Sequence, residues 1–157
     1  MLTLLVVATA VMIYCFSSQN AVLSSETSGR VTRFLLRVLI PGFDGMTAGE
    51  QQALISRYSP AVRKLAHFSE FFLLGLFLRL LLQRLPVKGK TALSWIGGTA
   101  YAVTDELHQM AVGGRAAMAL DVGIDSLGAL AGTLTALLLG ALSGKIAARR
   151  NRNPAVR

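Results

Sequence analysis

The sequence predicts an all-α fold: a polytopic membrane helical bundle with four transmembrane helices and an amphipathic helix in the long first loop. Three observations support this class. Hydrophobic residues make up 53% of the 157 residues, which is high for a soluble domain and ordinary for a small membrane protein. Four long runs carry at most one charged residue each. These runs are too long and too uniformly apolar for barrel strands, so helices would satisfy their backbone in lipid.

The four spans are expected at about 1–16, 61–84, 91–112 and 119–142. With their flanks, the last three reach roughly the 20 residues that cross a bilayer, whereas the first is short. The first run could instead be a signal peptide, but it lacks a basic n-region and a clear small-x-small cleavage site. We therefore expect it to be retained as a span. Cys15 stands alone inside it, so the sequence offers no internal disulfide.

The first loop, 17–60, opens with the polar stretch "SSQNAVLSSETSG", which is typical of turns. In Arg30–Ile40 apolar residues fall on one side and arginines on the other, which is the period of an amphipathic helix. This helix either lies on the membrane surface with its arginines toward headgroups or packs on top of the bundle. A loop is expected at 41–50. Thr47 with Glu50 has the spacing of a capping box that begins a short helix.

The net charge of +8 argues against a nucleic-acid partner, because the basic residues fall between and after the apolar spans. Anionic membrane lipids are the expected partner. The link between the second and third spans and the tail 145–157 are both basic and free of acids. By the positive-inside rule this side is cytoplasmic, which makes the loop 17–60 extracytoplasmic. Residues 1–144 are expected to form a single transmembrane domain, followed by a basic cytoplasmic tail.

Charged and titratable residues are concentrated at the ends of the later spans. Five of the eight acidic residues and both histidines lie at or inside these spans. Three polar faces result, since the residues on each span are three or four positions apart. They are Lys64, His67 and Glu70 on the second span, Asp105, Glu106, His108 and Gln109 on the third, and Asp121 and Asp125 on the fourth. In a small bundle these faces, all near the extracytoplasmic end, should point at one another.

The cost of these acids indicates a site. An ionised side chain at the centre of a span costs roughly 2.5–3.5 kcal/mol, and less near the interface. Five acids at half that cost approach the whole stability of a small domain, about 5–15 kcal/mol. Neutralisation by Lys64, Arg63, Arg115, the histidines or a metal ion would make the cost tolerable. The alternative is that these groups are solvated residues at helix ends.

Three blocks, "RKLAHFSEFFLLG", "AYAVTDELHQMAVGGR" and "LDVGIDSLGALAG", together with "YCFSSQN" after the first span, resemble the signature blocks of the VanZ-like membrane proteins. The resemblance implies a small polytopic protein of the bacterial cell membrane. The members that give the family its name are associated with resistance to the glycopeptide teicoplanin. Matching motif positions include Arg115 and the polar residues of the three faces, and Gln19 falls in the shorter Ser-Ser-Gln element.

Two functions are weighed for this site. The first is an enzyme acting on a lipid-linked or cell-envelope substrate, with a histidine as general acid or base and cations holding a phosphate. Its candidate catalytic residues are His67, Glu70, Asp105, Glu106, His108, Asp121 and Asp125. Its candidate ligand-binding residues are Arg63, Lys64, Gln109, Arg115 and Gln19. The second is a non-catalytic binder of a lipid headgroup, a peptidoglycan precursor or an antibiotic. A lipid translocator ranks last, because only one face carries polar groups.

A divalent metal is a candidate cofactor, since two histidines and several carboxylates are suitable ligands. The candidate metal ligands are His67, Glu70, Asp105, His108 and Asp125. The spacing does not match a known metal motif such as HExxH. Gly128 and Gly132 form a small-xxx-small surface for close helix approach, either within the bundle or between subunits of an oligomer.

Overall fold

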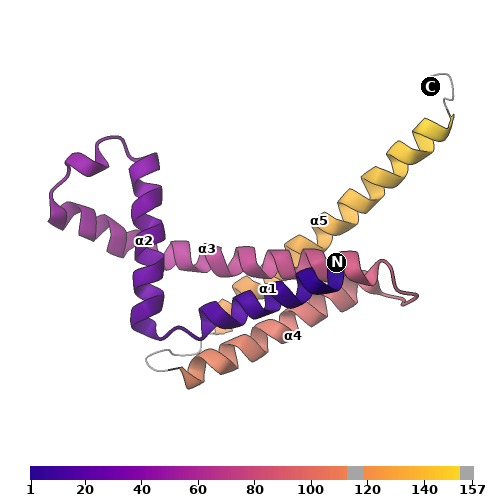
Figure 1. Cartoon of the computed structure of the whole chain (residues 1–157), viewed down its shortest axis with the longest axis horizontal. Coiled ribbons are helices and arrows are strands. Elements are labelled where there is room, and N and C mark those ends of the chain that lie inside the picture. Colours follow the sequence, from indigo (N-terminus) through magenta and orange to yellow (C-terminus); the bar gives the residue numbers. More distant parts are fainter. Residues whose placement is uncertain (113–118, 153–157) are drawn as a thin grey trace.

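The computed structural model describes residues 1–112 and 119–152, with side chains up to Gly144. This part of the chain is helical and contains no strand, which confirms the all-α class. Its elements are α1 (Leu2–Ser17), α2 (Ala21–Leu39), the short 3-10 helix η1 (Phe43–Gly45), α3 (Ala48–Leu82), α4 (Lys90–Ala111) and α5 (Ala119–Arg152). Helices α1, α3, α4 and α5 form an elongated bundle, and α2 stands across one end of it (Figure 1).

Two helices, α3 and the Ala119–Gly144 part of α5, are long and apolar enough to cross a membrane. A third span results if α1 and α2 count together, although they are bent by 111° at their junction. Helix α4 does not meet the same criterion within the described residues, because its last turns carry Asp105, Glu106 and His108. The apolar helices indicate a membrane protein with two clear spans and up to three.

An apolar core and close contacts at small residues hold the bundle together. Its core consists of Ile13, Phe71, Leu74, Ala102 and Ala129. Helices α3 and α5 approach so closely that a Cβ added to Gly132 would meet the backbone of Phe72 and Leu76. A Cβ on Gly128 would meet the backbone of Phe68 in the same way. The predicted small-residue surface therefore packs within the bundle.

The start of α2 corrects the expectation for the first loop. The helix begins at Ala21, inside the stretch expected to be a turn, and the side chain of Asn20 caps it by accepting a hydrogen bond from the Leu23 amide at 2.9 Å. The polar stretch is helical because its hydroxyl residues lie four apart and form the buried face of α2 toward α3. That face comprises Ser24, Ser28, Thr32 and Leu36.

Beside this buried face, α2 has an exposed apolar side. Val31, Phe34, Val38 and Leu39 are between 47% and 71% exposed. Of the two placements considered for this helix, the structure shows it packed on α3, but through its hydroxyl face. The apolar side remains available for contact with lipid.

Two helices are longer than the sequence indicated. The capping box of Thr47 and Glu50 is confirmed, but the helix it begins continues as α3 through Pro60 into the predicted second span. A proline removes one backbone donor, and α2 contacts α3 both before Pro60, at Ile55, and after it, at Arg63. Helix α5 likewise continues to Arg152 instead of ending near 142.

Candidate functional site

The ends of several helices meet where α2 turns away from the bundle. Figure 1 shows the C-terminal ends of α1 and α4 and the N-terminal end of α5 together at this end. The part of α3 around His67 packs against the same helices. The polar faces predicted on three separate helices are thus brought to one place.

His67, Asp105 and Asp125 form what we call the carboxylate cluster. One ligand atom from each of the three residues lies within 4.8 Å of the other two. Asp105 is 5% exposed and Asp125 is 2% exposed, so the cluster is buried. Each residue comes from a different helix, α3, α4 or α5. One imidazole nitrogen and two carboxylates at this separation are a suitable ligand set for a divalent ion.

Asp105 is held in place by two neighbours. The Ser17 hydroxyl donates to its Oδ2 at 2.8 Å, and the Gln109 side-chain amide donates to the same oxygen at 2.7 Å. Gln109 also donates to the Ser17 hydroxyl at 3.2 Å, which closes a ring of three hydrogen bonds. Ser17 is fully buried and was not among the predicted site residues. The Ser-Ser-Gln element was the signal that could have identified it.

Several further carboxylates lie close to the carboxylate cluster. Asp121, Glu106 and Glu70, together with Asp105, lie within electrostatic range of Asp125. Among the described residues, neither Oδ1 of Asp125 nor Oε2 of Glu70 has a hydrogen-bond partner, although both atoms are buried. The nearest cationic candidate to Glu70 is Nδ1 of His67, at 3.9 Å. A buried carboxylate oxygen without a partner is costly, and a bound cation would relieve that cost.

Lys64 and Asp121 form an ion pair at the rim of this region. Nζ of Lys64 lies 3.0 Å from Oδ1 of Asp121, and both side chains are more than a third exposed. A pair in contact with solvent contributes little to stability. Lys64 is therefore accessible to a ligand that approaches the rim.

His108 lies outside the carboxylate cluster, although it was predicted as a metal ligand. Its Nε2 is 3.1 Å from the hydroxyl of Ser18, and its ring stacks on Tyr14 with centroids 4.7 Å apart. Both partners belong to the end of α1 and the turn after it. His108 joins α1 to α4 in this structure.

Three predicted ligand-binding residues are placed elsewhere or not described. Arg63 points toward α2, where it donates to the hydroxyls of Ser25 and Ser28 at 2.9 and 3.3 Å. Gln19 lies in the turn between α1 and α2 and accepts a hydrogen bond from Thr27 at 3.3 Å. Arg115 lies outside the described residues.

Comparison with protein families gives one result. The family model described as VanZ/LLP1 matches residues 2–140, while no curated protein and no solved structure matches the chain. The matched range includes Ser17 and every residue of the carboxylate cluster, so the buried site lies within the part of the chain that defines the family. This match spans most of the sequence, and the chain belongs to the VanZ/LLP1 family.

Proposed function

We propose that the carboxylate cluster binds a divalent cation at the extracytoplasmic face of the bacterial cell membrane. With that cation the protein would hold or act on an anionic, cell-envelope or lipid-linked ligand. The observation that carries the proposal is the meeting of His67, Asp105 and Asp125, with ligand atoms within 4.8 Å and both aspartates almost fully buried. Opposite ligands of a divalent ion with bonds of about 2.0–2.6 Å are separated by a similar distance.

The proposed membrane arrangement has four spans, α1, α3, α4 and α5, in a single unit of residues 1–144. The acid-rich end of α4 is tolerated in this arrangement because Asp105 and Glu106 are buried against neighbouring helices rather than exposed to lipid. The basic tail 145–157 is cytoplasmic by the positive-inside rule. One span, α5, then separates the tail from the cluster, and three spans separate the tail from α2, so both would lie on the outer face.

Two roles for the cation follow from its neighbours. As a Lewis acid it would polarise a phosphoryl or carbonyl oxygen, with the carboxylate of Glu70 3.9 Å from Nδ1 of His67 as a candidate acid or base for the substrate. As an anchor it would hold a phosphate or carboxylate of a headgroup, a peptidoglycan precursor or an antibiotic without chemical change. If the protein is an enzyme, a product should form with the wild type and not with His67→Gln. If it is a binder, the ligand should be retained unaltered.

The cation is tested by metal content and affinity. We expect Asp125→Asn to lose bound divalent metal after purification in detergent, and to bind added Mn²⁺ at least about tenfold more weakly by electron paramagnetic resonance. Asp44→Asn is the matched control, because Asp44 is exposed and pairs with Arg37 outside the cluster. Equal Mn²⁺ affinity in the two variants would refute the cation site.

The link to glycopeptides is tested in cells. By the family resemblance, expression of the chain should raise the teicoplanin concentration needed to stop growth. Asp125→Asn should remove this protection and Asp44→Asn should keep it, at equal protein levels in the membrane. Protection by both variants would separate the phenotype from the carboxylate cluster.

A further inference from the structure

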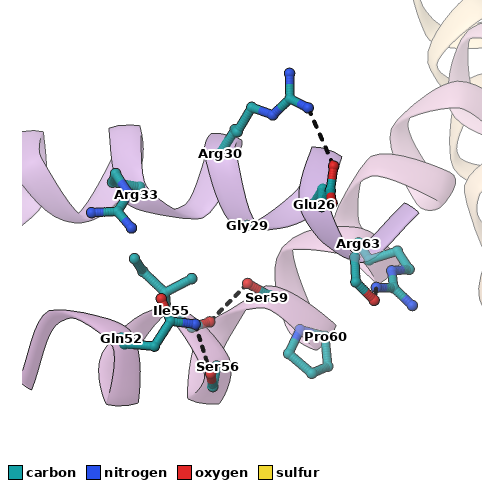
Figure 2. A pocket seen from close by; sticks show the side chains of 11 residues that line it. Glu26, Gly29, Arg30, Arg33, Gln52, Ile55, Ser56, Ser59, Pro60 and Arg63 are labelled. Carbon is teal, nitrogen blue, oxygen red and sulfur yellow. Dashed lines mark hydrogen bonds and ion pairs between the residues drawn. The ribbon is translucent and has the colours of Figure 1, made fainter. Parts of the chain in front are cut away.

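A second site lies away from the carboxylate cluster, between α2 and the first part of α3. It is an open pocket of about 600 Å³, shown in Figure 2. Its volume is within the range of about 300–1,000 Å³ that is usual for small-molecule sites. Its wall shares no residue with the cluster, so what it binds does not depend on the proposed cation.

The pocket is strongly basic. Arg30 and Arg33 from α2 and Arg63 from α3 line it, against a single acid, Glu26. Three arginines and one glutamate leave an excess of two positive charges. Glu26 pairs only with Arg30, at 3.6 Å, and both side chains are more than half exposed. Such a pair is weak in solvent, so Glu26 does not neutralise the pocket.

The two remaining arginines have neutral partners. Arg33 donates to the side-chain oxygen of Gln51 at 3.3 Å, and Arg63 donates to the hydroxyls of Ser25 and Ser28. Within the described part of the chain, neither arginine contacts a carboxylate, and the buried Nε of Arg63 has no hydrogen-bond acceptor. The positive charge of both guanidinium groups is therefore not neutralised there, and each group has further N–H donors available for a ligand.

The other polar groups in the wall suit the same ligand. Gln52 and Ser56 line the pocket beside the arginines and offer amide and hydroxyl donors (Figure 2), and the hydroxyl of Ser25 lines it as well. Arginine binds phosphate through two parallel hydrogen bonds, and hydroxyl and amide groups complete the shell of a tetrahedral oxyanion. On the far side of α2, Phe34 and Val38 are exposed and apolar, as expected for a helix beside lipid tails.

We propose that the pocket between α2 and α3 binds a phosphate group at Arg63, with Arg33 at the other end of the pocket adding positive charge. A lipid phosphate at the membrane surface and a free phosphate offer the same chemistry to these residues. The position of the pocket on a helix with an exposed apolar side favours the lipid phosphate. Arg63 also donates to Ser25 and Ser28, so the phosphate would bind where α3 contacts α2.

The test uses the full chain in detergent with two probes. One is inorganic phosphate, followed by isothermal titration calorimetry, and the other is short-chain phosphatidic acid, followed by native mass spectrometry against phosphatidylcholine. We expect Arg33→Gln with Arg63→Gln to weaken binding by roughly tenfold or more. Arg57→Gln is the matched control, because Arg57 does not line the pocket. A preference for phosphatidic acid over both other probes identifies the source as lipid.

Two further variants serve as controls for this test. Arg63→Lys keeps a positive charge near Ser25 but loses the planar fork, so it should keep α2 in place and still weaken binding. In metal-free buffer, where the cation site is not loaded, Asp125→Asn should leave phosphate binding unchanged, so failure of the cation site and failure of this pocket are distinguishable. Wild-type affinity for both probes in the double arginine variant, or equal loss in Arg57→Gln, would overturn the proposal.

Discussion

The bundle and the arm are built in different ways, where the arm means α2, η1 and residues 48–60 of α3. The bundle joins its helices through backbone-close contacts at glycines and buries several carboxylates at one end. The arm has a separate small core of Leu36, Phe43 and Ile55, with helix caps at Asn20 and Thr47. Its charged side chains are mostly exposed or paired with neutral groups.

This difference shows which region keeps groups whose burial costs stability. The buried acids of the bundle lower its stability unless something binds them, which is typical of a functional site. The arm uses devices that stabilise any small helical unit, and its excess positive charge is exposed to solvent. The carboxylate cluster of the bundle is therefore negatively charged and suited to a cation, whereas the arm is positively charged and suited to an anion. The two regions lie next to each other.

The largest effect is expected from the close contact that holds the bundle together. Gly132→Ala should destabilise it by more than about 3 kcal/mol, because the added Cβ would meet backbone atoms of α3 that cannot rotate away. The yield of monodisperse protein in detergent and its thermal melt by circular dichroism would show this loss. Gly144→Ala is the control, since a Cβ there meets nothing within 4 Å. Equal melts for the two variants would mean that α3 and α5 do not pack as closely as described.

The arm should respond independently of the bundle. Phe43→Ala should cost about 3 kcal/mol locally, because Phe43 is 1% exposed and anchors the separate core. Hydrogen exchange should speed up at the α2 amides and remain slow in α4 and α5. Phe34→Ala removes an equal side chain that is 65% exposed and should change little. Faster exchange across the whole bundle would show that the two regions form one cooperative unit.

The sequence predicted the bundle's polar end better than the arm. Helical spacing alone places His67, Asp105 and Asp125 on faces that point inward, because buried charge has few other solutions in an apolar bundle. Ser17 was missed, since a serine that ends an apolar run has the same local pattern whether it is solvated or bonded to a distant carboxylate. Only the position of α4 determines which of these holds.

The arm shows why local patterns are insufficient. The serines before Arg30 favour turns by propensity, yet tertiary contact with α3 makes them the buried face of a helix. The second span was expected to begin at about 61, yet α3 runs from Ala48 through Pro60, because one missing donor does not end a helix. Arg63 was assigned to the acidic site by its sequence neighbours, and the rotation of α3 places it toward α2 instead.

The smallest effect concerns the contact that links α1 to the cluster. Ser17→Ala removes the donor to Oδ2 of Asp105 and leaves Gln109 as its remaining described hydrogen-bond partner. Loss of a group that orients a metal ligand typically lowers metal affinity by about 10–100-fold, so Mn²⁺ binding should weaken by that amount while the fold persists. Ser18→Ala is the neighbouring control, because Ser18 is exposed and contacts His108 outside the cluster. If the Ser18 variant weakened Mn²⁺ binding as much as the Ser17 variant, α1 would support the bundle in general and not the site.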